Sequence, residues 1–250
     1  MSIDISYDFT TEPAGYWDGF WNRKDGLGKG AFDPDCASET LQSYHQLLWS
    51  RKLPNGETMQ LQKGARSHKY LTWNGHRFGS DSIIVSLRYK KYKSMIDEAA
   101  KRIEDFHAFY EDIIHKSYTI GGTIIFPKHR CSMNQMKGWN PLISDRWDLT
   151  LECIRRFYSE EASPLSGVIK TDSWFYKLFK SFRGYVDFFF LQDCVSPDYS
   201  RVDIWCGSGK FNESGLPQSV EEYFSFIENE LLFLKKRNER IGKFCQENGM

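Results

Sequence analysis

Apolar residues recur every three or four positions in several long stretches of the chain, which is the spacing of one face of a helix. Ser38 is a suitable N-cap for the first stretch, and Ser219 with Glu222 has the spacing of a capping box at the start of the last. The predicted helices are one that begins after Ser38 and others over residues 93–117, 145–158, 173–182 and 220–247.

Short alternating and β-branched runs lie between the first two of these helices and predict strands. ETMQLQ (57–62) alternates, and DSIIVSLRY (81–89) is β-branched. YTIGGTIIFP (118–127) carries a Gly-Gly pair, which indicates a bulge or a close approach of two backbones. The turn over residues 54–56, Pro-Asn-Gly, is of the kind that joins two strands, and a further edge strand is predicted over residues 200–206.

These elements predict an α+β fold, with a small antiparallel sheet in the N-terminal half and a mainly helical C-terminal half. The strands of the sheet are drawn from residues 50–126. No internal repeat or low-complexity tract divides the chain. We therefore expect a single domain over residues 1–250, with a possible division into a sheet-containing part, 1–126, and a helical part, 127–250.

Composition narrows the class of protein. The 33 Lys and Arg residues balance the 33 Asp and Glu residues, so bulk attraction to nucleic acid or to an anionic membrane is not expected. The N-terminus lacks a basic leader followed by an apolar run, and no uncharged apolar segment reaches the roughly 18 residues of a membrane helix. The six cysteines stand singly, without a CxxC pair, so we expect free thiols and a cytoplasmic protein that does not bind membranes.

The segment ISDRWDLTLECIRRFY (143–158) concentrates charged residues among apolar and aromatic ones. On a helical wheel the apolar residues form one stripe, and most of the charged residues share the opposite face. One interpretation is a solvated helix face, because acids near the start of a helix and arginines near its end suit the helix dipole. Glu152 also has the favoured spacing for ion pairs with Arg155 and Arg156, each contributing about 0.2–0.5 kcal/mol.

The second interpretation of this segment is a polar ligand site. Amides just upstream, beside a Gly-Trp-Asn-Pro turn, offer donors and acceptors, while arginines bind phosphate through a two-pronged fork and carboxylates act as bases. His45 would complete the site from the N-terminal half, although a lone histidine beside leucines is more often structural. The candidate catalytic residues are Asp145, Asp148, Glu152 and His45, and the candidate ligand-binding residues are Asn134, Gln135, Arg146, Arg155 and Arg156.

If this site exists, Asp145 and Arg146 are expected to be less than half exposed and to share a cleft with Asn134. We assign no metal ligand and leave the cofactor unknown, although the acids of the segment also suit a divalent metal. The GSDS segment (79–82) is either a polar loop at the mouth of a site or a turn in which an aspartate caps its own backbone.

Two function classes stay open. The first is an enzyme that acts on a nucleotide or a nucleic acid through the polar site. The run SLRYKKYKS (86–94), with bases between tyrosines, suits single-stranded nucleic acid, but such a run is more commonly a solvated strand end. The second class is a non-catalytic interaction or regulatory protein of a bacterial defence or toxin-related system, with the long C-terminal helix as its contact for a protein partner.

Several blocks of the sequence resemble those of an uncharacterised family of bacterial cytoplasmic proteins, described only as a domain of unknown function. The resemblance runs from Phe32 to Ile241, and the N-terminal thirty residues carry none of it. It implies that the chain is one unit and brings no activity, cofactor or catalytic residue. The blocks are FDPDCASETLQSYHQLLWSRKLPNGE, FGSDSII, TIGGTIIFP, LISDRWDLTLECIRRFY and GYVDFFFLQDCV.

Overall fold

The computed structural model describes residues 2–12, 34–64, 70–83 and 92–250, and it has the predicted α+β architecture. The strands form a four-stranded antiparallel sheet in the order β1-β2-β3-β4. All four lie before residue 128, and mainly helices follow. The strands are β1 (Gln62–Lys63), β2 (Leu71–Trp73), β3 (His76–Ser82) and β4 (Thr123–Pro127).

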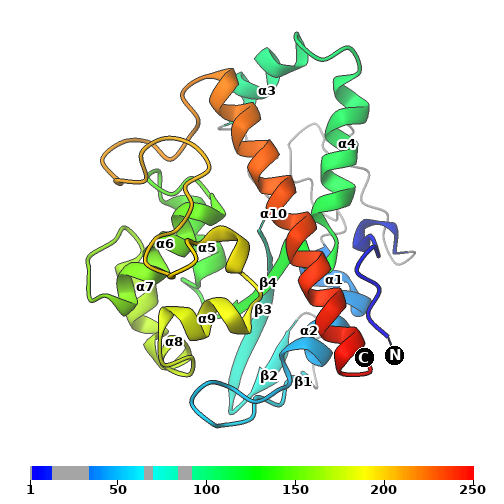
Figure 1. Cartoon of the computed structure of the whole chain (residues 1–250), viewed down its shortest axis with the longest axis vertical. Coiled ribbons are helices and arrows are strands. Elements are labelled where there is room, and N and C mark those ends of the chain that lie inside the picture. The colour runs from blue at the N-terminus through cyan, green and yellow to red at the C-terminus, as the bar shows by residue number, and fades with distance from the viewer. Residues whose placement is uncertain (1, 13–33, 65–69, 84–91) are drawn as a thin grey trace.

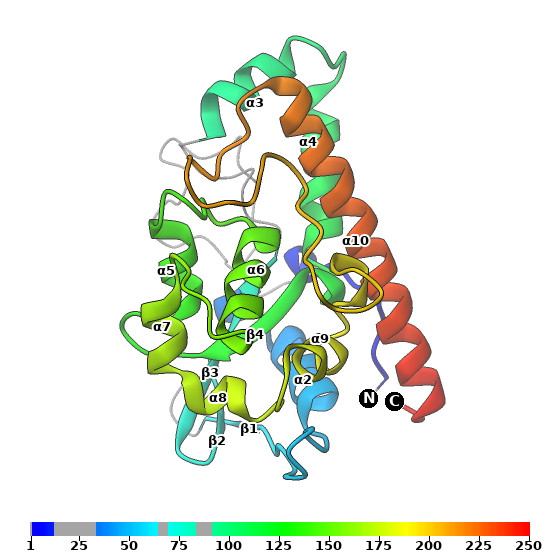
Figure 2. The same cartoon turned by 60° about the vertical axis from the view of Figure 1, so that its left-hand side comes forward.

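Helices lie on both sides of this sheet (Figures 1 and 2). The helices before β4 are η1 (Phe9–Thr11), α1 (Pro34–Ala37), α2 (Glu39–Trp49), α3 (Lys93–Ala100), α4 (Phe106–Ser117) and η4 (Ile120–Gly122). Those after it are α5 (Met133–Trp139), α6 (Trp147–Tyr158), α7 (Ser166–Thr171), α8 (Ser173–Lys177), α9 (Phe182–Phe188), η5 (Gln192–Cys194) and α10 (Val220–Glu247). In both views α5, α6 and α7 lie on one side of β4, and α10 lies on the other beside α4.

Two predicted helix starts are confirmed by their caps. The Ser38 hydroxyl accepts the backbone N–H of Leu41 at the start of α2. The Ser219 hydroxyl accepts the N–H of Glu222 at the start of α10, and the Glu222 carboxylate in turn accepts the N–H of Gln218, one residue before the cap. The capping residues therefore fixed where these helices begin, as their sequence indicated.

The predicted helix over residues 93–117 is wrong as one element, because it is divided into α3 and α4. The Asp105 side chain accepts the N–H of Ala108 and starts a new helix there. The predicted helix over residues 173–182 is likewise shorter and ends at Lys177, and α9 starts separately at Phe182.

The strand predictions were displaced along the chain. Residues 57–62 contribute an isolated bridge between Lys52 and Thr58, which the Pro-Asn-Gly turn connects, and only Gln62 enters β1. The GSDS segment is neither loop nor turn but the end of β3, while residues 84–89 of the predicted strand lie outside the described residues. Residues 200–206 also form only a bridge, from Val202 to Val195.

The Gly-Gly pair marks a close approach of backbones, as its sequence indicated. A Cβ atom on Gly122 would lie 1.8 Å from the carbonyl oxygen of Ser117, and one on Gly121 would lie 2.5 Å from the Asn238 side chain of α10. The Arg237 guanidinium, fully buried, donates to the carbonyl oxygens of Gly121 and Thr123. The pair therefore lets α10 pack directly against the start of β4.

The buried side of α10 overlaps the one that the helical wheel indicates, since Tyr223, Ile227 and Leu234 are buried, but it is rotated towards one flank. The wheel places Tyr223, Phe224, Ile227, Leu231 and Leu234 on the packed side, with Phe226 and Phe233 at its flanks. In the structure both flanking phenylalanines are buried, whereas Phe224 and Leu231 are only partly buried. The segment over residues 202–206 causes this rotation, because its Trp205 ring packs on Phe226 and Phe233.

No helix within the described ranges is long and apolar enough to cross a membrane. Five cysteines have described side chains, and all five are free thiols: Cys131 is exposed, and Cys153, Cys194, Cys206 and Cys245 are buried. The side chain of Cys36 lies outside the described residues.

Candidate functional site

The end of β3 presents buried polar side chains to both faces of the sheet. Ser80, Asp81 and Ser82 are 5%, 8% and 2% exposed, and alternate residues of a strand point to opposite faces. The two serines meet α1 and α2, while Asp81 meets α5. Three consecutive buried polar residues in an inner strand need partners on both sides, and distant segments supply them.

On the first face a chain of hydrogen bonds links a carboxylate to a histidine. The hydroxyls of Ser80 and Ser82 donate to the two carboxylate oxygens of Asp35, each over 2.7 Å. The Nε2 atom of His45 lies 2.9 Å from the Ser80 hydroxyl, and its Nδ1 accepts the indole N–H of Trp49. Since an indole only donates, His45 carries its proton on Nε2 and donates it to Ser80.

This arrangement makes His45 a positioning residue of the network. Burial, together with the charge of Arg237, lowers the pKa of His45 to about 3, so the ring is neutral at physiological pH. Both ring nitrogens are engaged, and the side chain is fully buried. The lone pair that a general base requires is held by Trp49, so the geometry does not favour the catalytic role we expected for His45.

On the second face one buried ammonium group lies between two carboxyl groups. The Nζ atom of Lys137 is 2.5 Å from Asp145 and 3.3 Å from Asp81, and it donates to the carbonyl oxygen of Ser82. Burial raises the pKa of Asp81 to about 8, with Lys137 opposing that rise and Asp145 adding to it. Asp81 is therefore a carboxyl group that exchanges its proton near neutral pH.

The backbone places Asp145 outside α6. Ser144 and Asp145 have φ values of +53° and +65°, in the left-handed region that side chains other than glycine rarely adopt. The helix therefore begins at Trp147, two residues later than predicted. The N–H of Asp145 donates to the carbonyl oxygen of Lys137, which fixes the turn between α5 and α6. Such strained residues concentrate at functional sites.

Arg146 and Asp148 form a buried ion pair that fastens the loop before α10. They are 3% and 0% exposed, and two guanidinium nitrogens of Arg146 donate to the two carboxylate oxygens of Asp148. The same guanidinium donates to the carbonyl oxygens of Cys206 and Gly215, and Asp148 also accepts the N–H of Trp205. Most of the donors of Arg146 are thus occupied within the protein.

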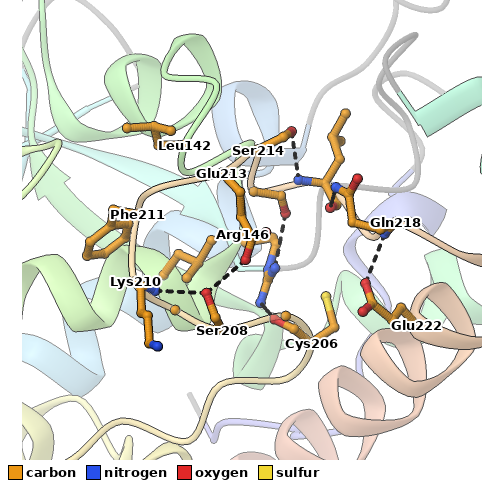
Figure 3. Close-up of a pocket in the computed structure, with 15 residues that line it drawn as sticks. Leu142, Arg146, Cys206, Ser208, Lys210, Phe211, Glu213, Ser214, Gln218 and Glu222 are labelled. Carbon is orange, nitrogen blue, oxygen red and sulfur yellow. Dashed lines mark hydrogen bonds between the residues drawn. The ribbon is translucent and has the colours of Figure 1, made fainter.

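A small pocket lies above Arg146, walled by the loop of residues 206–218 (Figure 3). Its volume of about 70 Å³ gives room for roughly two water molecules or one phosphate-sized group. Gly207 and Gly209 in its wall have φ values of +68° and +65°. Lys210 contributes an exposed cation, while the wall also includes carboxylates, among them Glu213, which accepts the Ser208 hydroxyl.

Glu230 of α10 adds a further buried acid to this region. It is 1% exposed, and neither of its carboxyl oxygens has a hydrogen-bond partner. Burial, together with the charges of Asp148 and Asp145, raises the pKa of Glu230 well above its usual value, although Arg146 and Lys137 oppose this. The surroundings of Glu230 therefore favour its protonated form, and the charges of both ion pairs act on it.

The other predicted site residues lie apart from this centre. Glu152 pairs with Arg155 and Arg156 at the predicted spacings, over 2.7 and 2.9 Å, and Arg155 continues to Glu161. The ion pairs of these three residues agree with the helix-surface interpretation. Glu152 itself does not lie on the surface, because it is only 9% exposed. The cluster ties the end of α6 to the following turn.

The amides of α5 do not join Asp145 or Arg146. Asn134 accepts the Ser132 hydroxyl, and the buried Oε1 atom of Gln135 has no hydrogen-bond partner. The low exposure predicted for Asp145 and Arg146 is confirmed, at 1% and 3%. The pocket that Arg146 lines does not include Asn134, so the shared cleft is not supported.

Three residues of the centre, Asp35, Lys137 and Glu230, were not singled out by the sequence analysis, and Asp81 was considered only as part of the GSDS segment. Asp35 and Lys137 lie in the FDPD and NQMKG segments, and Asp81 lies in the GSDS segment. Glu230 is an acid on the apolar side of a long helix, and this position could have identified it from the sequence as a buried acid. The basic run over residues 86–94 is mostly outside the described residues; within it Tyr92 donates to the carbonyl oxygen of Ser144 and Lys93 pairs with Asp97.

Among the described residues, no group of three or more His, Cys, Asp or Glu side chains is arranged to hold a metal ion. The centre brings together carboxyl groups whose pKa values are raised by burial, and such groups can transfer protons. The residues of the two faces come from the FDPD, YHQLLW, FGSDSII and LISDRWD blocks, which meet at the end of β3, with Lys137 and Glu230 beside them.

The raised pKa of Asp81 predicts a specific dependence of stability on pH. Its folded pKa of about 8 exceeds the ordinary value of 3.8, so between these limits the folded protein binds one more proton than the unfolded chain. The contribution of Asp81 is complete below about pH 4 and is lost as the pH rises towards 8, by up to about 1.4 kcal/mol per unit. We expect Asp81→Asn to lose less stability than the wild type between pH 5 and pH 8 in urea denaturation. Parallel curves for the two proteins would show that Asp81 is ionised throughout.

Comparison with known proteins places the chain in one family. No curated protein and no solved structure matches it. A family model matches residues 3–241, which extends the predicted resemblance through most of the N-terminal thirty residues. The chain therefore belongs to a family of unknown function, DUF6994.

Proposed function

We propose that the protein is an enzyme that acts on a nucleotide or nucleic-acid substrate, with Asp81 and Asp145 as its acid–base pair. The observation that carries this proposal is the buried Lys137 ammonium between the two carboxyl groups, one of which has a pKa of about 8. A general acid or base works best when its pKa is near the working pH. Asp81 would exchange the proton, and Asp145 would hold the Lys137 ammonium beside it.

The cost of this arrangement to stability supports a functional role. Replacement of a buried ion pair by apolar residues is often neutral or stabilising, so buried charge is weak evidence for a purely structural purpose. The Oδ2 atom of Asp145 and both oxygens of Glu230 are buried without hydrogen-bond partners, and Ser144 and Asp145 have a strained backbone. Polar groups left unsatisfied in this way are rare outside functional sites.

The substrate class rests on the neighbouring pocket. The pocket above Arg146 has the size of one phosphate group, and the guanidinium lines it as a positive charge whose donors are mostly engaged within the protein. The glycine-rich wall exposes backbone around the cavity, and Lys210 stands at its rim as a mobile point charge. A phosphoryl group of the substrate would bind there, with the rest of the substrate extending along the surface.

A nucleotide panel tests this function. We expect the wild type to convert at least one nucleoside mono-, di- or triphosphate or short oligonucleotide, measured as product by chromatography. Asp81→Asn and Asp145→Asn should each lower the rate at least about 100-fold, the usual contribution of a general acid or base. Asp112→Asn is the matched control, because its carboxylate is 54% exposed and pairs with Lys116 on the surface of α4. A wild type that neither binds nor converts any member of the panel contradicts the proposal.

The second candidate function is partner binding through α10, and one observation favours it. A groove of about 710 Å³ lies between the N-terminal segment, α4 and α10, and it includes Ile5 and Leu234. Leu232 in this groove is 51% exposed, which is unusual for a large apolar side chain. Under this function Leu232→Asp should release a protein that co-purifies with the wild type, and Lys236→Asp should not.

A further inference from the structure

A second, larger pocket lies at the opposite end of α10 from its N-cap, where three distant segments meet. The segment after α2, the connection from α8 to α9 and the end of α10 surround a volume of about 750 Å³. Figure 2 shows α2 and α9 side by side in this part of the molecule. Pockets of 300–1,000 Å³ hold small organic ligands, so the space fits more than an inorganic ion.

Cations predominate around this pocket. The lining includes Arg51, Lys52, Lys180 and Arg183, against the single carboxylate of Asp187. That carboxylate already accepts hydrogen bonds from the Tyr199 hydroxyl and the Gln192 amide, over 2.7 and 3.0 Å. Arg183 is 71% exposed and lies 3.5 Å from Asp187, so it keeps donors for a ligand.

The partly buried Arg51 is the clearest sign of an anion site. Its guanidinium lies 4.5–4.6 Å from the ring centres of Phe188, Phe190 and Phe244, and it donates to the carbonyl oxygen of Phe188. Its Nε atom is buried without a hydrogen-bond partner, and Arg51 makes no ion pair with any described residue. Burial lowers the pKa of Arg51 to about 10, so the cation is present at neutral pH without a carboxylate to balance it.

The same pocket has an apolar side. Leu53, Pro54 and Phe179 line it together with Phe188 and Phe244. A ligand that matches both sides has several adjacent negative charges and a compact apolar or aromatic group.

We propose that this pocket binds the polyphosphate group of a nucleoside di- or triphosphate, with Arg51, Lys180 and Arg183 on the phosphates and the base against Pro54 and Phe244. Phosphates match the forked donors of arginine, and an exposed lysine adds a mobile point charge. Free polyphosphate shares the recognised chemistry and differs only in lacking the base. The pocket shares no lining residue with the one above Arg146, so the inference goes beyond the acid–base function.

Calorimetric titration of the intact protein with ATP, AMP and tripolyphosphate tests the proposal. We expect ATP to bind and the Lys180→Asn/Arg183→Gln variant to weaken its Kd at least about tenfold, as two charged contacts are lost. Asparagine is chosen because Lys180 has a φ of +63°, a conformation that asparagine tolerates. Lys236→Asn, on the exposed face of α10, is the matched control and should leave the Kd within about twofold.

The arms of the titration distinguish the two sources of the polyphosphate. In both cases AMP should bind more weakly than ATP. If ATP binds more tightly than tripolyphosphate, the site is assigned to a nucleotide. If the two affinities are equal, it is assigned to free polyphosphate. Failure of ATP and tripolyphosphate to bind, or unchanged affinity in the double variant, overturns the proposal. The Asp145→Asn variant should bind ATP in this pocket with wild-type affinity. Loss of turnover at the acid–base centre and loss of ATP binding in this pocket are therefore separate results.

Discussion

Arg146→Met is expected to lower the free energy of unfolding by about 3–5 kcal/mol, the usual cost of breaking a buried ion pair on one side. The change leaves Asp148, which is 0% exposed, with the N–H of Trp205 as its one remaining hydrogen-bond partner among the described residues. It also removes the donors to the carbonyl oxygens of Cys206 and Gly215. Methionine retains much of the apolar stem, so the loss reports on charge and hydrogen bonds rather than on a cavity. Urea denaturation at pH 7 measures it.

Two further variants identify the cause. Arg102→Met removes an arginine that is 46% exposed and pairs with an exposed Glu221, and it should leave the midpoint of urea denaturation nearly unchanged. Arg146→Met combined with Asp148→Leu should be less destabilising than Arg146→Met alone, because no unpaired buried charge remains. If Arg146→Met costs less than about 1 kcal/mol, the guanidinium does not hold the loop and is available to a ligand instead.

The elements that were predicted correctly are those whose signals are local. Ser38 and Ser219 cap the helices that follow them, and the terminal helix ends at Glu247 as its pattern indicated. The division between α3 and α4 was missed because apolar spacing continues across it, while the Asp105 cap was not weighed. A capping side chain thus determined both the helix starts that were predicted correctly and the division that was missed.

Strand register required partners that no local pattern reveals. The strand was predicted to start at Asp81, yet β3 starts at His76, in a tight turn with Trp73, and residues 84–89 of the prediction lie outside the described residues. The residues of β3 pair with those of β4, some forty positions further along the chain. Neither the boundary nor the burial of the polar end follows from alternation within the segment itself.

The acids and arginines of residues 145–156 have the pattern of a solvated helix, but four of these six residues are buried. Asp145 is outside the helix because of its positive φ, and Arg146 and Asp148 are covered by the loop that they bind. A helical wheel assigns direction within one helix and carries no information on a loop some sixty residues away. The sequence therefore identified the charged residues, but it did not reveal that a distant loop buries some of them.

Phe226→Ala is expected to destabilise the fold by about 3–5 kcal/mol, since it removes a fully buried ring from the side of α10 that packs on the body. Phe226 is 0% exposed, and its ring centre lies 5.8 Å from that of Trp205. The Arg146 guanidinium lies 5.4 Å from the same ring, so the change also removes a cation–π contact in the region of the acid–base centre. The free energy of unfolding from urea denaturation at pH 7 is the measurement.

Leu232→Ala is the matched control on the same helix. Its side chain is 51% exposed in the groove beside α4, so the expected change in stability stays within about 0.5 kcal/mol. A large loss for Leu232→Ala with a small one for Phe226→Ala would mean that α10 packs through its other side. Small losses for both would mean that α10 is weakly attached to the body, and Glu230 would then be reached by solvent and would ionise at neutral pH.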